Sequence, residues 1–329
     1  MTRALVVDKD SSDNITTDIR EVGDDFLGEG DLLIDVAFSS LNYKDGMALA
    51  GDPGVARTLP LIPGIDVVGT VTESSSGRFR EGDEVVLNGA GLGERRHGGY
   101  TERLRIAADS TIALPEAFSA AQAAAIGTAG FTAALSVDAL VQQGVKPEDG
   151  DILVTGATGG VGSVALHLLS RLGYRPVALT GRVEEHGEYL RGLGAVDVLD
   201  RAEFEEAEKP MQKTRFAGVL DTVGSHILVN ALAQTRWGGV VTACGMAQGP
   251  DLPGSVLPFI LRAVRLIGIN SVDAPLELRE RAWSLLAEHL DPTVLEGFTE
   301  TLTLEEVAAA GADLLEGNRH GRAVVKLGQ

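Results

Sequence analysis

Hydrophobic and polar residues alternate in blocks through the middle of the chain. Short apolar runs rich in Val, Leu and Ile are separated by longer stretches with the spacing of an amphipathic helix. This alternation is typical of a doubly wound parallel sheet of about six strands, the Rossmann form of the α/β class. We expect the strands at residues 152–155, 176–180, 196–199, 217–221, 239–243 and 265–269.

The first third of the chain has a different pattern. Its short β-rich runs are separated by Gly and Pro, which predicts a mostly β domain with many turns. The expected strands lie at residues 3–7, 31–38, 60–71 and 82–87. The alanine-rich stretch 120–140 has helical spacing interrupted at Gly127 and Gly130, and we expect it to cross to the next domain.

The chain after residue 270 is predicted to return to the β-rich domain. Two helical stretches, 276–288 and 304–316, precede a final strand at 323–327. The expected division is therefore 1–122 for the first part of the β-rich domain, 123–270 for the Rossmann domain and 271–329 for the return.

A glycine-rich turn predicts a nucleotide site in the Rossmann domain. The sequence Gly-Ala-Thr-Gly-Gly-Val-Gly at 156–162 follows one predicted strand and opens a helix. Glycines let the backbone turn sharply and approach a pyrophosphate, and the start of the helix offers N–H groups to it. The residues expected to hold the pyrophosphate of a dinucleotide are Thr158, Gly159, Gly160 and Val161.

The end of the next predicted strand selects the cofactor. NAD sites usually place an Asp or Glu there, which binds the ribose hydroxyls. This chain has Thr180, Gly181 and Arg182 instead, and Arg201 follows in a later segment. Hydroxyl and guanidinium groups suit a 2′-phosphate, which a carboxylate would repel. The pattern predicts NADPH; the alternative is that both arginines are ordinary surface residues.

Composition and charge exclude several classes of protein. Apolar residues make up 44% of the chain and charged residues 23%, as in a globular protein. The net charge of −19 argues against non-specific binding to nucleic acid or to an anionic membrane. The single cysteine, Cys244, excludes an intrachain disulfide and a CxxC pair, and we expect it to be a buried thiol at a strand end.

The sequence gives no sign of a membrane or export segment. We expect no apolar run of the length that spans a bilayer, and the first ten residues, MTRALVVDKD, do not resemble a signal peptide. The expectation is a cytoplasmic protein.

Eight segments resemble the medium-chain dehydrogenase/reductase superfamily. They are SSLNYKD (39–45), PGIDVVGTV (63–71), GTAGFTA (127–133), VTGATGGVGS (154–163), DTVG (221–224), ACGMA (243–247), LPFILRAVRLIGINS (257–271) and HGRAVVKL (320–327). The resemblance covers essentially the whole chain. It is strongest to the zinc-free quinone oxidoreductase-like branch and, within it, to a subgroup of bacterial acrylyl-CoA reductases. It implies that the β-rich domain is a GroES-like catalytic domain.

The resemblance does not extend to the zinc ligands of alcohol dehydrogenases in this superfamily. Where those enzymes have a cysteine and a Gly-His-Glu segment, this chain reads Leu-Asn-Tyr-Lys-Asp (41–45) and Pro-Gly-Ile-Asp (63–66). Neither supplies a thiolate or an imidazole, and a catalytic zinc needs about three protein ligands. We therefore expect no metal site, and reduction of an activated C=C instead of oxidation of an alcohol.

The implied reaction is hydride transfer from NADPH to the β-carbon of a C=C conjugated to a carbonyl, with acrylyl-CoA reduced to propionyl-CoA. Tyr43 is the candidate donor of a hydrogen bond and a proton, and Asn42 is expected to orient the nicotinamide ribose or the substrate carbonyl. The alternative for Tyr43 is that its ring only stacks beside the nicotinamide. Lys44 and Asp45 are expected to form an ion pair that supports this loop.

The resemblance assigns further residues to the cofactor. It places Thr222, Met246 and Asn270 at strand ends that face NADPH, and Arg322 near the nicotinamide. Two other functions stay open: a quinone or enone/enal reductase that uses the same hydride step, and a non-catalytic NADPH-binding sensor.

Two further expectations concern binding partners. A CoA substrate calls for a basic rim, whose candidates are Arg57, Arg95, Arg96, Arg262 and Arg265, although scattered surface arginines explain these positions equally well. The apolar run 257–270 is either buried sheet or a subunit interface, and the resemblance favours a homodimer.

Overall fold

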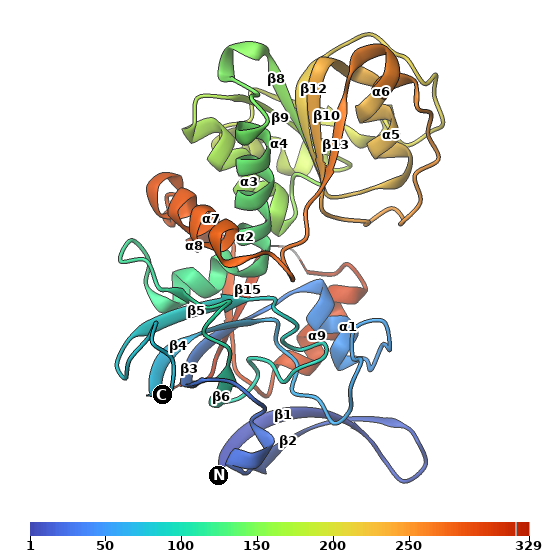
Figure 1. Cartoon of the computed structure of the whole chain (residues 1–329). Coiled ribbons are helices and arrows are strands. Elements are labelled where there is room, and N and C mark those ends of the chain that lie inside the picture. The colour runs from blue at the N-terminus through green and yellow to red at the C-terminus, as the bar shows by residue number, and fades with distance from the viewer. Residues whose placement is uncertain (320, 329) are drawn as a thin grey trace. The chain divides into compact units, whose positions relative to one another are not determined.

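The computed structural model describes residues 1–319 and 321–328, so the first residue of the segment 320–327 and residue 329 lie outside the described residues. The chain forms two compact units (Figure 1). Unit 1 consists of Met1–Phe131, Ser271–Glu280 and Pro292–Gln329, and unit 2 consists of Thr132–Asn270 and Arg281–Asp291.

The boundaries differ from those expected, because two helices each contribute to both units. Helix α2 (Ala120–Gln142) is broken at Gly127, whose φ is +49°, and the part before the break belongs to unit 1. Helix α7 (Leu276–His289) begins in unit 1 and ends in unit 2. Residues 123–131 therefore lie in unit 1 and residues 281–291 in unit 2, in place of a division after residues 122 and 270.

Unit 2 is a Rossmann fold, and the predicted doubly wound sheet is confirmed. Its parallel strands have the order β10-β9-β8-β11-β12-β13. The strands are β8 (Asp151–Thr155), β9 (Arg175–Thr180), β10 (Asp197–Asp200), β11 (Phe216–Asp221), β12 (Thr235–Ala243) and β13 (Arg265–Gly268). The helices between them are α3 (Gly160–Arg171), α4 (Val183–Gly192), α5 (Ser225–Gln234) and α6 (Leu257–Arg262).

The sheet of unit 2 is covered on both faces. The strand order grows outward from β8 in both directions, so right-handed connections put α3 and α4 on one face and α5 and α6 on the other (Figure 1). Every residue of the central strand β11 is buried. Such strands are continuous apolar runs, which is why the sequence pattern located all six of them.

Unit 1 is mostly β, as predicted. Its main sheet has the order β14-β15-β3-β4-β5-β7, with β6 paired to β3, and β1 and β2 form a separate hairpin. The strands are β1 (Thr2–Lys9), β2 (Ile15–Val22), β3 (Leu32–Leu41), β4 (Asp66–Ser74), β5 (Glu84–Asn88), β6 (Arg103–Ile106), β7 (Ile112–Ala113), β14 (Thr299–Leu302) and β15 (Arg322–Lys326). The helices are α1 (Tyr43–Leu49), α8 (Thr293–Glu296) and α9 (Val307–Leu315).

The register of this sheet brings four strand ends together. Leu41 at the end of β3 pairs with Ala323 near the start of β15. Asp66 at the start of β4 pairs with Asn88 at the end of β5. Because β3 and β4 are also antiparallel neighbours, all four ends lie along one edge of the sheet.

Strands β2, β6, β7 and β14 were not predicted. In β2 only Val22 is buried, and the mostly polar strand pairs with β1 alone. The other three have two to four residues each. Strands this short or this polar carry too weak an apolar alternation to be recognised.

One expectation about apolar runs was wrong. Among the described residues, α2 is long and apolar enough by composition to cross a membrane. Of the apolar window in this helix, 78% is buried inside the protein, as in the core helix of a globular fold.

Candidate active site

The glycine-rich turn of unit 2 lies at the end of β8, against the end of β11. Gly156 has a φ of +59°, and a Cβ there would lie 2.1 Å from the Thr222 Oγ1 atom. A Cβ on Gly162 would lie 2.4 Å from the carbonyl oxygen of Gly156. Gly156 is therefore required by its left-handed backbone conformation and Gly162 by the close approach of the main chain, and glycines of this kind let a phosphate reach the main chain.

Helix α3 begins directly after this turn. Gly159 is its N-cap and supplies no side-chain cap, so the first N–H groups of the helix face the turn without one. Thr158, Gly159, Gly160 and Val161 thus form the start of α3 beside the point where the strand order reverses, between β8 and β11. This is the crevice in which open α/β sheets bind ligands, although the assignment of these residues to a pyrophosphate stays a prediction.

The end of β9 carries hydroxyl and guanidinium groups. Thr180 is buried, and its Oγ1 accepts a hydrogen bond of 3.2 Å from the backbone N–H of Arg182. A Cβ on Gly181 would lie 3.2 Å from Arg201 Cζ, so the Arg201 guanidinium lies directly over Gly181. The predicted cation Arg201 thus lies at the end of β9. Its Nε also donates a hydrogen bond of 2.5 Å to Glu205.

Thr222, Met246 and Asn270 follow β11, β12 and β13 and therefore lie along the same carboxyl edge of the sheet. Thr222 is fixed to β8, because its Oγ1 donates to the Thr155 carbonyl and its N–H donates to the Thr155 hydroxyl, each at 3.0 Å. Met246 is 64% exposed in the loop after β12. The structure places all three where the sequence expected, and their contacts with a cofactor stay predictions.

Cys244 is only partly buried, directly after β12. Its thiol donates to the carbonyl of Asp221, and burial raises the pKa of the thiol to about 12. A thiol that stays protonated at neutral pH is a poor nucleophile. This agrees with the structural role expected from the sequence.

In unit 1, the four strand ends enclose a buried carboxylate. Asp66 is fully buried, and its oxygens accept five hydrogen bonds, from Ser40, Asn42, Asn88 and twice from Thr128. Thr128 follows the break in α2, where a Cβ on Gly127 would lie 2.8 Å from Asp66 Oδ2. The break in the helix therefore exists because two chain segments meet around this carboxylate.

Asp45 is the second buried carboxylate of this cluster. It accepts from the N–H of Asn42 at 2.8 Å and from the N–H of Ile65 at 2.9 Å, which caps α1 and fixes the loop before β4. Burial, and then the negative charge of Asp66, raise the pKa of Asp45 to about 7.

The expected ion pair between Lys44 and Asp45 was wrong. Asp45 points into the unit, whereas Lys44 pairs with Glu94 at 2.9 Å. Successive residues at the start of a helix point in directions about 100° apart, so the two side chains diverge. Both nevertheless hold the start of α1 in place.

Arg322, at the start of β15, is the cation of the cluster. Its Nε donates to the carbonyl of Ala125 at 2.8 Å, and its Nη1 donates to Asn42 Oδ1 at 3.2 Å. Its buried Nη2 has no hydrogen-bond partner among the described residues. Burial lowers the pKa of Arg322, and the charges of Asp66 and Asp45 oppose that shift.

The two predicted catalytic residues differ in exposure. Tyr43, the first residue of α1, is 59% exposed. Asn42 is held by hydrogen bonds to Ser40, Asp45, Asp66 and Arg322, so its amide is committed to the cluster. Both roles stay predictions, and an orienting role for Asn42 would require one of these bonds to be exchanged.

The residues at the centre of this cluster were not predicted from the sequence. Ser40, Asp66 and Thr128 each lie in one of the segments that carried the family resemblance, but none was singled out. The available signal was a polar residue at the end of an apolar run. Only the pairing of β3, β4, β5 and β15 shows that these residues meet.

Two of the arginines considered for a basic rim have structural roles. Arg262 donates to the carbonyls of Gln212, Ala233 and Thr235. Arg265 begins β13, at the amino edge of the sheet, and binds Gln143 and the carbonyl of Gly238. Neither lies at the carboxyl edge that carries the predicted cofactor residues.

Comparison with known proteins identifies the class. Residues 28–116 match the family "Alcohol dehydrogenase GroES-like domain", and residues 160–288 match the family "Zinc-binding dehydrogenase". The chain belongs to the medium-chain dehydrogenase/reductase superfamily, in its zinc-free branch. It is an oxidoreductase with a GroES-like and a Rossmann domain, as expected.

Particular relatives span the whole chain. Acrylyl-CoA reductase AcuI of Ruegeria pomeroyi is 43% identical over 99% of both chains. YhfP of Bacillus subtilis, which carries a quinone oxidoreductase name, is 40% identical over 99% of this chain and 98% of its own. The yhdH oxidoreductase of Salmonella enterica, solved in complex with NADP, is 43% identical with a TM-score of 0.94, over 99% of this chain and 100% of its own.

The zinc of related dehydrogenases does not fit this chain. The described residues contain no group of three or more His, Cys, Asp and Glu side chains that could hold a metal ion. In addition, the oxygens of Asp66 are already occupied by hydrogen bonds from uncharged donors, and Asp45 caps a helix. The donor set is that of a structural polar cluster, not of a zinc site.

The raised pKa of Asp45 predicts a pH-dependent contribution to stability. The unfolded chain holds the pKa near 3.8 and the folded chain near 7, so the folded state binds the proton more tightly. The contribution is complete below about pH 4 and is lost as the pH rises towards 7. At about 1.4 kcal/mol per pH unit, its upper bound is about 4 kcal/mol.

The measurement is the free energy of unfolding of the wild type minus that of Asp45→Asn, from pH 4 to pH 8. We expect this difference to fall with rising pH and to level off above about pH 7. Asp13→Asn, at an aspartate whose side chain is 80% exposed, gives the matched control for replacing a carboxylate by an amide. A difference that stays constant or rises with pH would show that Asp45 is not protonated in the folded protein.

Proposed function

We propose that this oxidoreductase reduces the C=C of an acyl-CoA thioester, acrylyl-CoA to propionyl-CoA, with NADPH. The observation that carries the proposal is the similarity to an acrylyl-CoA reductase from end to end of both chains. The absence of a fitting zinc site among the described residues agrees with it, because reduction of an already polarised C=C needs no Lewis acid to acidify a hydroxyl.

The residues of unit 2 fit the cofactor. NADPH supplies a hydride equivalent when it is bound. The turn at 156–162 and the start of α3 would hold its pyrophosphate, and Arg201 over Gly181, with Arg182 and Thr180, would hold its 2′-phosphate. The Salmonella relative binds NADP, which supports this assignment.

The residues of unit 1 supply orientation and a donor for the developing negative charge. Tyr43 presents an exposed hydroxyl, which would hydrogen-bond the thioester oxygen as the enolate forms and then protonate the α-carbon. Arg322 would lie near the nicotinamide, as the family resemblance implies, and its Nη1 would hold Asn42. Asn42 is hydrogen-bonded to Arg322 and is the N-cap of α1, so it would fix the positions of Arg322 and Tyr43 relative to each other.

A quinone reductase is the second candidate. It is supported by the similarity to YhfP, which is almost as great and also spans the chain. The hydride step would be the same, so the two candidates differ only in what the substrate offers beyond its reactive group. A non-catalytic NADPH-binding sensor is not favoured, because Tyr43 and the Asp66 cluster are both present.

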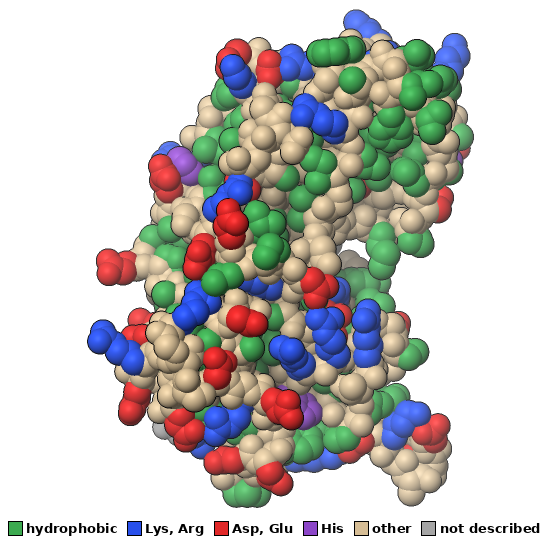
Figure 2. All heavy atoms as spheres, in the orientation of Figure 1, with side chains coloured by type: hydrophobic (Ala, Val, Ile, Leu, Met, Phe, Trp, Pro, Cys, Tyr) green, Lys and Arg blue, Asp and Glu red, His purple; other side chains and the backbone are tan. Residues whose placement is uncertain are grey.

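We also propose a homodimer in the cytoplasm. Strand β13 is the last strand of the unit 2 sheet, and Ile260 and Leu261 on the preceding helix are 68% and 60% exposed. Figure 2 shows apolar side chains gathered over the α5–α6 side of this unit. The single cysteine leaves no intrachain disulfide that an oxidising compartment would use.

The proposed homodimer has an expected mass near twice 34.4 kDa, which light scattering measures. Ile260→Asp should shift the protein to the monomer, because it puts a charge into the proposed apolar contact. A monomeric wild type would remove this part of the proposal.

The proposed 2′-phosphate site predicts that the enzyme prefers NADPH to NADH. We expect Arg201→Ala to raise the KM for NADPH about tenfold or more and to change the KM for NADH little, because a charge-assisted hydrogen bond to phosphate is lost. The control is Arg175→Ala, which removes an arginine that is 61% exposed at the opposite end of β9. Equal use of both cofactors by the wild type would overturn the assignment.

The substrate is tested by steady-state oxidation of NADPH, with acrylyl-CoA and 1,4-benzoquinone in parallel. We expect saturable turnover of acrylyl-CoA with a kcat/KM at least about tenfold above that of the quinone, since binding energy from the CoA moiety contributes to the transition state. Turnover of the quinone alone would favour the second candidate. Binding of NADPH without turnover of either would favour the sensor.

A further inference from the structure

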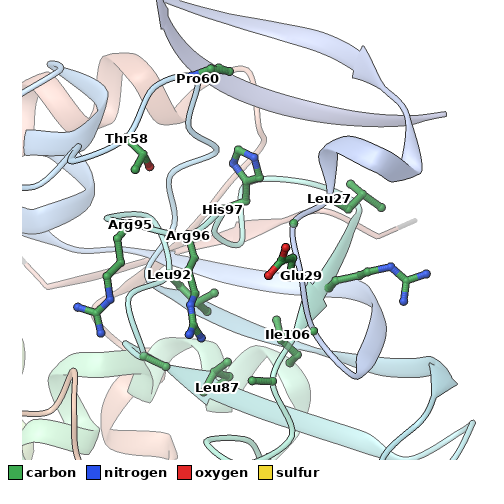
Figure 3. Close-up of a pocket in the computed structure, with 15 residues that line it drawn as sticks. Leu27, Glu29, Thr58, Pro60, Leu87, Leu92, Arg95, Arg96, His97 and Ile106 are labelled. Atoms are coloured by element: carbon green, nitrogen blue, oxygen red, sulfur yellow. The ribbon is translucent and has the colours of Figure 1, made fainter.

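A cavity of about 630 Å³ opens in unit 1 outside the Asp66 cluster. Its volume is within the range of about 300–1,000 Å³ that is usual for small-molecule sites. Figure 3 shows Arg95 and Arg96 side by side, Glu29 on the side of Arg96 away from Arg95, and Leu87 below Arg96.

The arginines stand on a rigid loop. The carbonyl of Gly91 accepts hydrogen bonds from the N–H groups of Arg95 and Arg96, and the N–H of Gly93 donates to the carbonyl of Arg96 at 2.9 Å. Gly91 has a φ of +82°, and a Cβ there would lie 2.7 Å from Arg95 Nε. The loop is therefore ordered before any ligand arrives, which reduces the entropy cost of binding.

The cavity is a positive site on a strongly acidic chain. Arg96 is exposed, and no ion pair or side-chain hydrogen bond joins it to another described residue. Arg95 pairs with Asp273 at 2.8 Å, but both side chains are more than 40% exposed, so this pair is weak and exchangeable. Two guanidinium groups side by side repel each other unless an anion lies between them.

His97 also lines the cavity and adds a neutral donor. Its Nδ1 accepts a hydrogen bond of 3.0 Å from the N–H of Ile62, so the ring proton is on Nε2. Burial lowers the pKa of His97, and its ring stacks on Phe26 at 4.6 Å. The imidazole is thus held in one tautomer and one orientation.

The cavity is linked to the candidate active site through two contacts. Glu94 lies next to Arg95, is buried, and pairs with Lys44 beside Tyr43. On the other side, Leu87 lines the cavity and its neighbour Asn88 donates to Asp66 at 2.8 Å. The loop that carries the arginines is therefore fixed to the helix that begins with Tyr43.

We propose that this cavity binds the phosphorylated nucleotide end of the CoA thioester, with Arg96 and Arg95 bonded to phosphate oxygens. The inference rests on the proposed function. Guanidinium groups bind phosphate in a two-pronged geometry, and an exposed pair on an ordered loop provides it. Leu87 and Leu92 provide apolar surface for a nucleobase, and Glu29, which also lines the cavity, accepts a hydrogen bond from a base amino group.

The test compares acrylyl-CoA with a short acrylyl thioester of N-acetylcysteamine, which has the same reactive group but no nucleotide. For the wild type we expect kcat/KM to favour the CoA ester. In Arg96→Ala this preference falls about tenfold, mainly through KM for the CoA ester, and in Arg96→Lys it falls less. Arg80→Ala removes an arginine that is 90% exposed on the β4–β5 turn and keeps the preference of the wild type.

Calorimetry tests binding of the nucleotide end to the cavity without any turnover of substrate. Adenosine 3′,5′-bisphosphate is titrated into wild type and Arg96→Ala by calorimetry, with NADP⁺ at saturation to occupy the cofactor site. We expect binding to the wild type and at least about tenfold weaker binding to Arg96→Ala.

The outcomes distinguish the failure of each proposal. A wild type that reduces both thioesters equally well would contradict CoA as the substrate, and with it this inference. A wild type that prefers CoA, while Arg96→Ala keeps both the preference and the affinity for the bisphosphate, would overturn the cavity alone.

Discussion

The buried carboxylate of Asp66 is the constraint around which the candidate catalytic unit is built. A fully buried carboxylate is tolerated only when hydrogen bonds replace its hydration. Those bonds come from the end of β3, the end of β5 and the break in α2. Asn42 connects the same carboxylate to Arg322 at the start of β15. Four segments far apart in sequence are thereby held at one edge, and the position of Tyr43 follows from theirs.

The nucleotide unit is built on a different principle. Its proposed cofactor site depends on glycines: Gly156 has a φ of +59°, and Gly162 lets α3 approach the backbone of the turn more closely than a Cβ would permit. The cations then lie outside this backbone, with Arg201 over Gly181. A chain of net charge −19 can offer an anion site here because the positive groups are local. The cavity beside Arg96 in unit 1 repeats this arrangement, with guanidinium groups on an ordered glycine-containing loop.

The sequence was sufficient for the parts of the molecule that local pattern determines. Buried parallel strands are continuous apolar runs, so all six strands of unit 2 were predicted, and the turn at 156–162 was recognised from its own residues. The Asp66 cluster was missed because it depends on the pairing of strands that are distant in the chain. The Lys44–Asp45 pair was predicted wrongly for a similar reason, because the partner of Lys44 is Glu94, 50 residues away. The substrate assignment rests on family resemblance, since no local pattern encodes it.

In the proposed reaction, the chain transfers hydride from NADPH to the C=C of an acyl-CoA thioester. The most direct measurement is the position of the label when acrylyl-CoA is reduced with NADPH that carries deuterium at its transferable position. We expect propionyl-CoA with one deuterium on the β-carbon and a solvent proton on the α-carbon, both visible by NMR. Deuterium on the α-carbon, or a thioester that stays unreduced while a quinone consumes the cofactor, would contradict it.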